Sequence, residues 1–510
     1  MATGNNKQLA INMMAQFLSF AVSMGISFVL TPYIVKSLGA AAYGFVGLTT
    51  NIVGYTSLLT IALNSMASRY ITISYAQGKY DEANKYFSSV FYSNMGISAF
   101  IIIIMGITVC YLEFFFEIPN ELVFDVKLLF SLLVLNTIVS LMTNIYGVAT
   151  FIKNRLELST ICSIIGNTVR AVVLIIMFGF LSPHLWYFGI TAMLVTIYLA
   201  YANYHFTRKL TPELRIHRDS FDLGKVKELT LSGMWNLFNK LGGIFAQGMD
   251  LVLVNLFIGA TAMGYFSIAN NIPMLFISIC ASIAGVFAPL MTTYYAQKNM
   301  QALIIELNKS IRILGCLCLM PLVTLYIYGA DFYSLWIPTE NPVKLQTLTL
   351  LVGFGMVFSM PLEALWNIFT ITNKLKYSTI YIFCQQIISF LIVLSMMFVV
   401  NDIYIKLCII AGTRTAIGII KSVLFLPIYG SICLNISKKT FYYPLFKSFV
   451  CFTISMCFCY VIRHFLVADT WQKFVLASFL CCIVVALTGL IIILKKEDRL
   501  FIKTKILRIK

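Results

Sequence analysis

Six ionisable side chains interrupt the long apolar runs of this chain of 510 residues. A charge at the centre of a membrane-spanning helix costs roughly 2.5–3.5 kcal/mol on insertion scales, so such residues are functional candidates by default. Cations in a low-dielectric site can neutralise an anionic ligand, and a partly buried carboxylate is readily tuned to exchange a proton or hold a cation. Four cations against two anions favour an anionic ligand. The six residues are Lys240, Asp250, Arg170, Glu363, Arg414 and Lys421.

Each of these residues also has a structural interpretation. Lys240 and Asp250 are separated by roughly 15 Å along a helix, too far to pair with each other. Either could pair with a charge on another helix, for example Asp250 with Arg414. Lys421 lies near the end of its apolar run, where snorkelling to the interface is the favoured interpretation. For Lys240 and Arg414, exposure to a cavity is favoured over a buried structural pair.

The sequence contains no arrangement typical of an enzyme, a metal site or a cofactor site. The 13 cysteines are scattered through apolar runs without a CxxC pair, and the four histidines show no ligand spacing. A glycine-rich phosphate loop and an HExxH motif are both absent. The acidic residues between 113 and 125 are weak catalytic candidates. We therefore expect a protein that is not an enzyme and needs no metal or cofactor.

Composition identifies a membrane protein that crosses the bilayer many times. The chain is 60% hydrophobic and only 11% charged, whereas soluble domains contain about 25% charged residues. Most lysines and arginines lie in short connectors, so the net charge of +17 indicates membrane topology and not nucleic-acid binding. The positive-inside rule places both termini in the cytoplasm. Runs of roughly 20 apolar residues predict about fourteen transmembrane helices, centred near residues 22, 53, 100, 136, 169, 195, 244, 275, 320, 358, 388, 416, 453 and 482.

An internal repeat covers about six of these spans. Three matches spread along the chain share nearly the same offset between their first and second copies. Because six is an even number, both copies enter the membrane in the same direction, which makes the repeat parallel. The matched segments are LGAAAYGFVGLTTNI (38–52) with IGATAMGYFSIANNI (258–272), YAQ (75–77) with YAQ (295–297), and IKNRLELST (152–160) with ITNKLKYST (371–379).

The repeat predicts the organisation of the chain. We expect an N-lobe of spans 1–6 (1–207), a basic cytoplasmic linker (208–229), a C-lobe of spans 7–12 (230–430), an appendage of spans 13 and 14 (431–494) and a basic cytoplasmic tail (495–510). The tail mixes cations with apolar residues, which suits either an interfacial helix on anionic lipid or simple enforcement of topology.

Equivalent helices of the two repeats carry matching polar stripes. On span 7, Asn236, Lys240, Gln247 and Asp250 fall on one face at 100° per residue. On span 1, Gln16 and several serines form the same stripe, and the offset superposes Gln16 on Asn236. The simplest destination for both stripes is a shared hydrated cleft.

The charges, in contrast, differ between the repeats. Lys240 and Asp250 fall opposite Phe20 and Leu30, so they are asymmetric additions to a symmetric polar scaffold. Glu363 lies in the segment MPLEALWN, where the proline predicts a helix kink. Its counterpart is an asparagine, which makes the position polar in both copies.

These features together resemble the polysaccharide repeat-unit flippases of the multidrug/oligosaccharidyl-lipid/polysaccharide exporter superfamily. The resemblance rests on the two six-span lobes, the LGxxxYGxxxL-like turn after span 1, its echo IGATAMGYFSIAN, and the aspartate of MDLVLVNLFIGA in span 7. It implies a V-shaped, all-α transporter of about fourteen helices, two of them C-terminal additions, that works by alternating access. Span 1 lacks charged residues between Lys7 and Lys36, unlike the related lipid II flippases.

The resemblance also implies a function. We expect a bacterial inner-membrane flippase for undecaprenyl-diphosphate-linked oligosaccharide, driven by H⁺ or Na⁺, with polysaccharide polymerase and chain-length proteins as candidate partners alongside membrane lipids. The alternative is a cation-coupled multidrug antiporter, and a membrane-embedded polymerase is disfavoured by the short loops. Candidate ion-coupling residues are Asp250 and Glu363, and candidate substrate-binding residues are Lys240, Arg414, Arg170, Asn236, Gln247 and Gln16.

Overall fold

The computed structural model describes residues 2–494 except 154, 248 and 373. Within these residues the chain forms helices joined by turns and contains no β-strand. A chain in hydrocarbon must satisfy its backbone polar groups internally, which helices do within one segment. The predicted all-α membrane fold is confirmed. Contacts group the chain into two units, Met1–Gly264 and Tyr265–Lys510.

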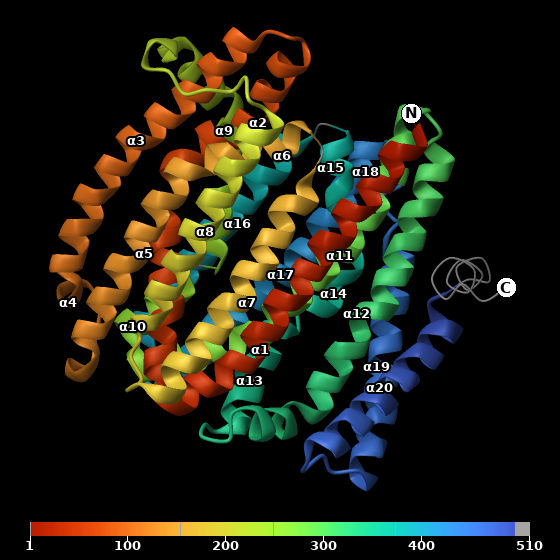
Figure 1. The fold of residues 1–510 in the computed structure, drawn as a ribbon. Coiled ribbons are helices and arrows are strands. Elements are labelled where there is room, and N and C mark those ends of the chain that lie inside the picture. Colours follow the sequence, from red (N-terminus) through yellow and green to blue (C-terminus); the bar gives the residue numbers. More distant parts are fainter. Residues whose placement is uncertain (1, 154, 248, 373, 495–510) are drawn as a thin grey trace. The chain divides into compact units, whose positions relative to one another are not determined.

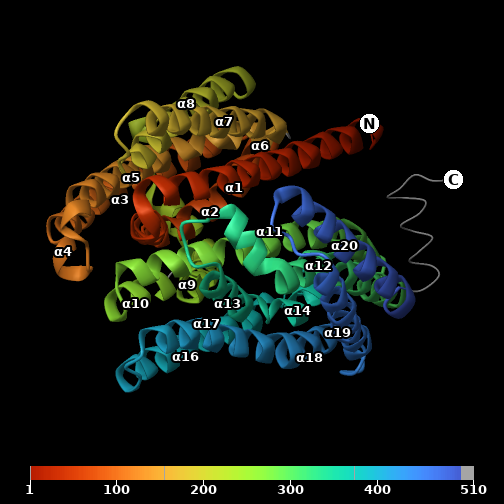
Figure 2. The same ribbon diagram turned by 90° about the horizontal axis from the view of Figure 1, so that it is seen from below.

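The first unit is a bundle of long helices (Figure 1). Its elements are α1 (Ala2–Tyr55), α2 (Leu58–Ala76), α3 (Tyr80–Cys110), α4 (Leu112–Phe115), the 3-10 helix η1 (Asn120–Leu122), α5 (Val123–Thr143), the 3-10 helix η2 (Asn144–Gly147), α6 (Val148–Ile152), α7 (Leu156–Phe180), α8 (Tyr187–Leu210), the 3-10 helix η3 (Arg218–Ser220), α9 (Leu223–Gln247) and α10 (Met249–Phe257). Helix α7 packs between α1 and α8 (Figure 2). Helix α9 packs against α2 so closely that a Cβ on Gly233 would overlap the carbonyl oxygen of Ala62.

The second unit begins within α11 (Ala260–Ala296) and contains an extended hydrophobic core cluster. Its other elements are α12 (Met300–Trp336), α13 (Pro342–Gly353), α14 (Met356–Ser359), the 3-10 helix η4 (Met360–Leu362), α15 (Leu365–Ile371), α16 (Leu375–Val399), α17 (Ile403–Ile420), the π-helix η5 (Lys421–Phe425), α18 (Leu426–Leu434), α19 (Tyr442–Phe465) and α20 (Trp471–Ile492). Helices α12, α19 and α20 pack against one another (Figures 1 and 2).

Helix boundaries reproduce the internal repeat. Helices α7 and α16 begin at Leu156 and Leu375, which are equivalent positions of the matched segments 152–160 and 371–379. Their ends are equivalent too, since both helices have the same length of 25 residues. Helices α2 and α11 both end at the alanine of their YAQ segments. The internal repeat predicted from the sequence is therefore present as repeated helix boundaries.

Left-handed backbone recurs at equivalent positions as well. Gly39 and Gly259 have φ angles of 84° and 119°, and Gly78 and Lys298 have φ angles of 74° and 56°. Glycine adopts this region without the steric cost that a Cβ imposes. Three of the four positions are glycines, so residue type largely explains why both repeats turn at these places.

Twelve helices among the described residues are long and apolar enough to cross a membrane. The predicted number was about fourteen, and two features account for the difference. Helix α1 runs through a kink at Gly39 and contains 54 residues, enough for two crossings of roughly 20 residues each. Helix α8 has the length but is rich in tyrosine and polar residues. The position near residue 53, predicted as the centre of the second span, lies at the end of α1, and the chain continues as α2.

The segment predicted as a basic linker, 208–229, is folded against α3. Ser88 accepts a hydrogen bond from the backbone of His217, and Ser89 accepts one from the backbone of Asp222. The Lys225 ammonium lies 2.8 Å from a Glu82 carboxylate oxygen, and this contact raises the pKa of Lys225. The boundary between the two contact units does not fall here, because α9 packs on α2.

Candidate functional site

The charged residues of span 7 lie on α9 and α10, which together make one candidate membrane span over Asn236–Phe257. Lys240 is exposed on α9. Asp250 lies on α10, and its side chain is buried. The Asp250 carboxylate acts electrostatically on the hydroxyl of Tyr55, the last residue of α1. That hydroxyl is buried without a hydrogen-bond partner among the described residues. Tyr55 was not identified from the sequence.

The structure describes only some of the side chains in the polar stripe of span 7. The Asn236 amide nitrogen donates a 3.0 Å hydrogen bond to the Ser65 hydroxyl on α2. This contact helps to hold α9 against α2 and leaves the amide oxygen for other partners. The side chains of Gln16 and Gln247 lie outside the described residues, so their substrate-binding role stays a prediction.

Arg170 lies on α7 and lines a small cavity of about 170 Å³. The residues that line this cavity come from α7 and α8, and most of them are aliphatic. Several of these side chains, such as Val169 and Leu194, are about half exposed. The structure therefore brings Arg170 to a lateral apolar cavity, and its role in substrate binding stays a prediction.

Glu363 lies at a break in the fourth span of the second repeat. Helix α14 gives way to η4, which carries Pro361 near its start, and α15 begins at Leu365. The predicted kink at Pro361 is confirmed. The first repeat breaks at the equivalent place, where α5 ends and η2 begins at Asn144. Discontinuous helices of this kind commonly form the binding sites of transporters, because they expose backbone groups inside the protein.

The break brings Glu363 next to a second charge. The Glu363 carboxylate and the Lys421 ammonium attract each other, and Arg414 lies close enough to repel Lys421. The Lys421 nitrogen also lies 5.8 Å from the centroid of the Trp366 ring, a cation–π contact. The sequence favoured snorkelling for Lys421. The structure places Glu363 near enough to attract the Lys421 ammonium, and snorkelling stays a prediction.

Local backbone features position this charged cluster, which we define as Glu363, Arg414 and Lys421. Lys421 begins the π-helix η5, and π-bulges occur frequently at functional sites. Next to Arg414, the Thr415 hydroxyl donates to the carbonyl oxygens of Leu351 and Val352 and so ties α17 to α13. On the other side, the side-chain amide of Gln385 on α16 donates a 3.0 Å hydrogen bond to the backbone carbonyl of Ile417 on α17. Helices on both sides thus fix the register of α17.

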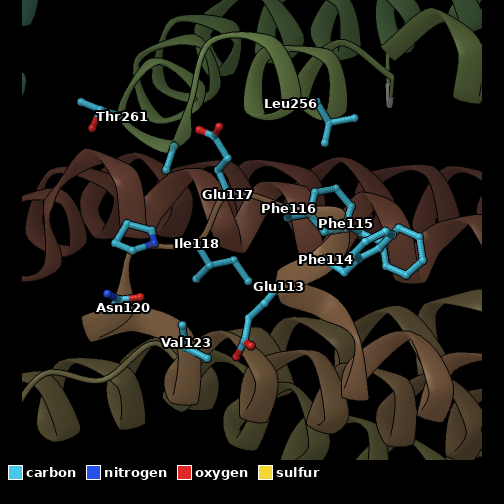
Figure 3. Close-up of a pocket in the computed structure, with 12 residues that line it drawn as sticks. Glu113, Phe114, Phe115, Phe116, Glu117, Ile118, Asn120, Val123, Leu256 and Thr261 are labelled. Carbon is cyan, nitrogen blue, oxygen red and sulfur yellow. The ribbon is translucent and has the colours of Figure 1, made fainter.

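An open groove lies where α4, the loop after it and η1 meet the turn between α10 and α11. Its volume is about 860 Å³. Figure 3 shows Glu113 and Glu117 on either side of Ile118, with phenylalanine rings grouped beside them. Glu113 forms a 2.7 Å ion pair with Lys127. Asn255, fully buried on α10, exchanges two hydrogen bonds with the backbone of Glu117 and holds the loop in place.

The described residues contain no cluster of three or more histidine, cysteine or carboxylate side chains suited to a metal ion. The cysteines are unpaired thiols, and they lie within the helices. What the site offers instead is a set of charges and amides on helices that can cross a bilayer. These features define a class of protein, a multi-pass helical membrane protein with an internal repeat of its helices.

The family follows from the sequence profile. The family described as "Polysaccharide biosynthesis protein" matches residues 9–295, more than half of the chain, and the chain belongs to this family. The membrane protein EpsK of Bacillus subtilis (strain 168) is 24% identical over 492 residues, covering 96% of this chain and 97% of EpsK. The predicted place among the polysaccharide members of the exporter superfamily is confirmed.

Solved structures share the fold. An inward-closed structure of the lipid II flippase MurJ has a TM-score of 0.71 at 14% identity, covering 98% of this chain and all of MurJ. An inward-facing multidrug resistance transporter of the MATE family, in the MOP superfamily, has a TM-score of 0.55 at 14% identity, covering 98% of this chain and 99% of its own. The MATE-like transporter fold predicted from the sequence is therefore present.

Proposed function

We propose that this protein is a flippase that moves an undecaprenyl-diphosphate-linked oligosaccharide across the bacterial inner membrane by alternating access, with both termini in the cytoplasm. The observation that carries the proposal is membership of a polysaccharide biosynthesis family by a chain with a transporter fold. The flippase activity in the name of MurJ, a protein of the same fold, supports the direction of the proposal.

The cations would bind the diphosphate. Lys240 is exposed on α9, and Arg414 belongs to a charged cluster in a helix that crosses the membrane. Arginine and lysine bind phosphate strongly where water is scarce, arginine in a bidentate manner and lysine as a point charge. Asn236, Gln16 and Gln247 would bond sugar hydroxyls, and Arg170 is a further candidate for the lipid-linked end.

Glu363 would couple the cycle to an ion. In its charged form it attracts Lys421. Protonation of Glu363, or its capture of Na⁺, would release Lys421 and raise the positive charge around Arg414, which favours the diphosphate. Loss of the ion would restore the Glu363–Lys421 attraction and favour release. Asp250 beside Tyr55 is the second candidate for the same role.

Proteoliposomes test the proposal directly. Purified protein should move a lipid-diphosphate oligosaccharide from one leaflet to the other, measured by access of a membrane-impermeant probe to the sugar. Lys240→Ala and Arg414→Ala each remove a charged hydrogen-bonding group worth about 1.5–3 kcal/mol, so transport at limiting substrate should fall roughly 10- to 100-fold. Protein levels should be unchanged. Wild-type transport, or normal surface polysaccharide in cells carrying either variant, would contradict the assignment.

The second candidate is a cation-coupled multidrug antiporter, favoured by the fold shared with a MATE transporter. In that case Asp250 and Glu363 would bind the coupling ion, and the cations would be structural. The same proteoliposomes would then move organic cations against a Na⁺ or H⁺ gradient and leave the lipid-linked glycan in its leaflet.

A further inference from the structure

The small cavity between α7 and α8 contains a charge that has no counterpart in its surroundings. Its volume is about 170 Å³, and its lining is apolar apart from Arg170, Thr191 and Tyr198. The Thr191 hydroxyl donates a 2.9 Å hydrogen bond to the Tyr187 carbonyl oxygen within α8, and the Tyr198 hydroxyl is engaged by Cys162 of α7. Among the residues that the structure describes, neither a hydrogen bond nor an ion pair reaches Arg170. Arg170 is therefore the one polar group of this lining without a partner.

An arginine without a counter-charge is unfavourable at this place. Helix α7 is long and apolar enough to cross a bilayer, and Arg170 lies well inside it. Snorkelling lowers the cost of such a charge by carrying the guanidinium toward water, whereas the Arg170 side chain lines the cavity. An anion bound in the cavity would lower that cost by pairing with the guanidinium directly.

Close packing fixes the backbone beside the cavity. At Gly166, α7 approaches α8 so closely that a Cβ would lie 2.9 Å from a methyl carbon of Val195. Gly166 precedes Arg170 by about one helical turn, so this contact positions the arginine against α8. The cavity therefore follows from the way in which the two helices pack.

The cavity opens on aliphatic surface. Val169 is 49% exposed and Leu194 is 51% exposed. Both side chains lie on α7, a candidate membrane span, and on α8, which packs against it (Figure 2), so hydrocarbon would cover them. The volume is below the roughly 300–1,000 Å³ of pockets that enclose drug-sized ligands. The cavity therefore has room for a charged group and the hydrocarbon next to it, and not for an oligosaccharide.

The depth of Arg170 distinguishes two kinds of lipid phosphate. Arg170 lies roughly 21 Å along the axis from the first residue of α7 and roughly 15 Å from the last, which is close to the middle of the span. Phosphates of resting phospholipids lie at the two surfaces of a hydrocarbon layer about 30 Å thick. A phosphate reaches the depth of Arg170 only while its lipid crosses the bilayer.

We infer that the α7–α8 cavity binds the phosphate end of a polyisoprenoid lipid in transit, with the phosphate on Arg170 and the adjoining chain against Val169 and Leu194. Arginine binds phosphate in a bidentate manner, which gives direction as well as strength to the contact. The inference rests on the proposed function and assigns one of its steps to a site on the first repeat. The cavity includes neither Lys240 nor Arg414.

Native mass spectrometry of the full-length protein in detergent tests the inference with farnesyl phosphate as the probe, beside farnesol, which has the same chain and no phosphate. Farnesyl phosphate should bind more tightly than farnesol. Arg170→Gln should lower the affinity for farnesyl phosphate about 10- to 100-fold, the loss expected for one charged hydrogen-bonding group. Arg208→Gln, which removes an exposed arginine of α8 outside the cavity, is the matched control and should bind as the wild type does.

A second variant fills the cavity and keeps its charge. Val173→Phe adds a ring to the lining and should also weaken the binding of farnesyl phosphate, because the chain loses its space. Without lipid, Arg170→Gln should melt at the wild-type temperature, since it removes no hydrogen bond or ion pair among the described residues. Weaker binding by this variant would then report the lost contact and not a folding defect.

Three results would overturn the inference and leave the proposed function standing. In the first, Arg170→Gln and Arg208→Gln bind farnesyl phosphate alike. In the second, phosphatidylglycerol binds through Arg170 as tightly as farnesyl phosphate, which would make this a site for a resting phospholipid. In the third, inorganic phosphate displaces farnesyl phosphate at equal concentration. A wild type that binds farnesyl phosphate through Arg170 and flips no lipid-diphosphate oligosaccharide in proteoliposomes would instead overturn the proposed function, and with it the transit role of this site.

Discussion

The two repeats of this protein share a helix pattern and differ in charge. Their fourth spans break at equivalent positions, Asn144 in the first and Glu363 in the second. The helix after the second break contacts Lys421 through Trp366. By contrast α8, the last span of the first repeat, has no lysine, arginine or carboxylate before Arg208. Duplication therefore accounts for the scaffold, and the charged cluster belongs to the second copy.

This difference bears on mechanism. A symmetric pair of broken helices supplies two equivalent places where backbone and polar groups can face a ligand. Among the described residues, the break of the second repeat holds an ionisable pair, whereas the equivalent position of the first repeat is the neutral Asn144. The two breaks therefore share their backbone pattern and differ in charge. The predictions below test whether the scaffold is as symmetric, and the charges as asymmetric, as the structure indicates.

The largest effect should come from the close crossing of α1 with the first turns of α11. Gly44 and Gly264 are equivalent in the two repeats and touch each other there, and a Cβ on Gly264 would overlap the carbonyl oxygen of Ala40. Gly264→Val should destabilise the protein by at least about 3 kcal/mol, because backbone atoms cannot yield to the added side chain. Gly285→Val, in open space on the same helix, is the control. Melting temperature and the yield of monodisperse protein report the result, and equal stability of the two variants would show that the crossing does not matter.

The charged cluster should give the next largest effect. Glu363→Gln or Lys421→Met leaves one half-buried charge without the opposite charge that attracts it, and should lower the free energy of unfolding by about 1–3 kcal/mol. The double variant should cost less than the sum of the two, which a double-mutant cycle by thermal or denaturant unfolding would measure. Asn144→Ala in the first repeat should have little effect, since that side chain is exposed. Strict additivity of the two charge substitutions would rule out a Glu363–Lys421 pair.

A smaller effect distinguishes the equivalent left-handed turns. Gly78→Ala should destabilise by about 1 kcal/mol, because an L-residue at positive φ carries a steric cost. Lys298 in the second repeat already carries that cost, so Lys298→Gly should leave stability unchanged or slightly raised. Gly106→Ala, in the interior of α3, should raise stability by about 0.5–1 kcal/mol. Thermal unfolding of the three variants measures the signs, and a loss in Lys298→Gly would contradict the equivalence.

The smallest effect concerns a contact found in the first unit. The Tyr75 hydroxyl donates a 2.7 Å hydrogen bond to Glu213, and this bond lowers the pKa of the Glu213 carboxyl. A lowered pKa stabilises the folded state above the ordinary carboxyl pKa, and that contribution is lost as the pH falls through the folded value. Glu213→Gln should therefore flatten the acid limb of the melting temperature against pH. Tyr75→Phe should move the same limb in the same direction, and unchanged curves would show that the bond is absent in solution.

Much of the fold could be predicted because its signals are local in sequence. Apolar runs identified the membrane class, and the echo of LGAAAYG in IGATAMG identified the repeat before any helix was placed. Pro361 predicted the break in the second repeat. The matching break at Asn144 has no proline that would predict it, whereas the kink at Gly39 lies in the segment where the sequence predicted a turn after span 1.

The chain's sequence by itself determined its membrane class, its duplication and the identity of its intramembrane charges, because hydropathy, offsets and residue types are properties of a linear string. The tertiary structure decided which charges meet. Glu363 and Lys421 lie on different spans, and Asn255 reaches a loop far earlier in the chain. These residues come close together only after the helices have packed, and electrostatic attraction depends on distance in space and not on separation along the chain.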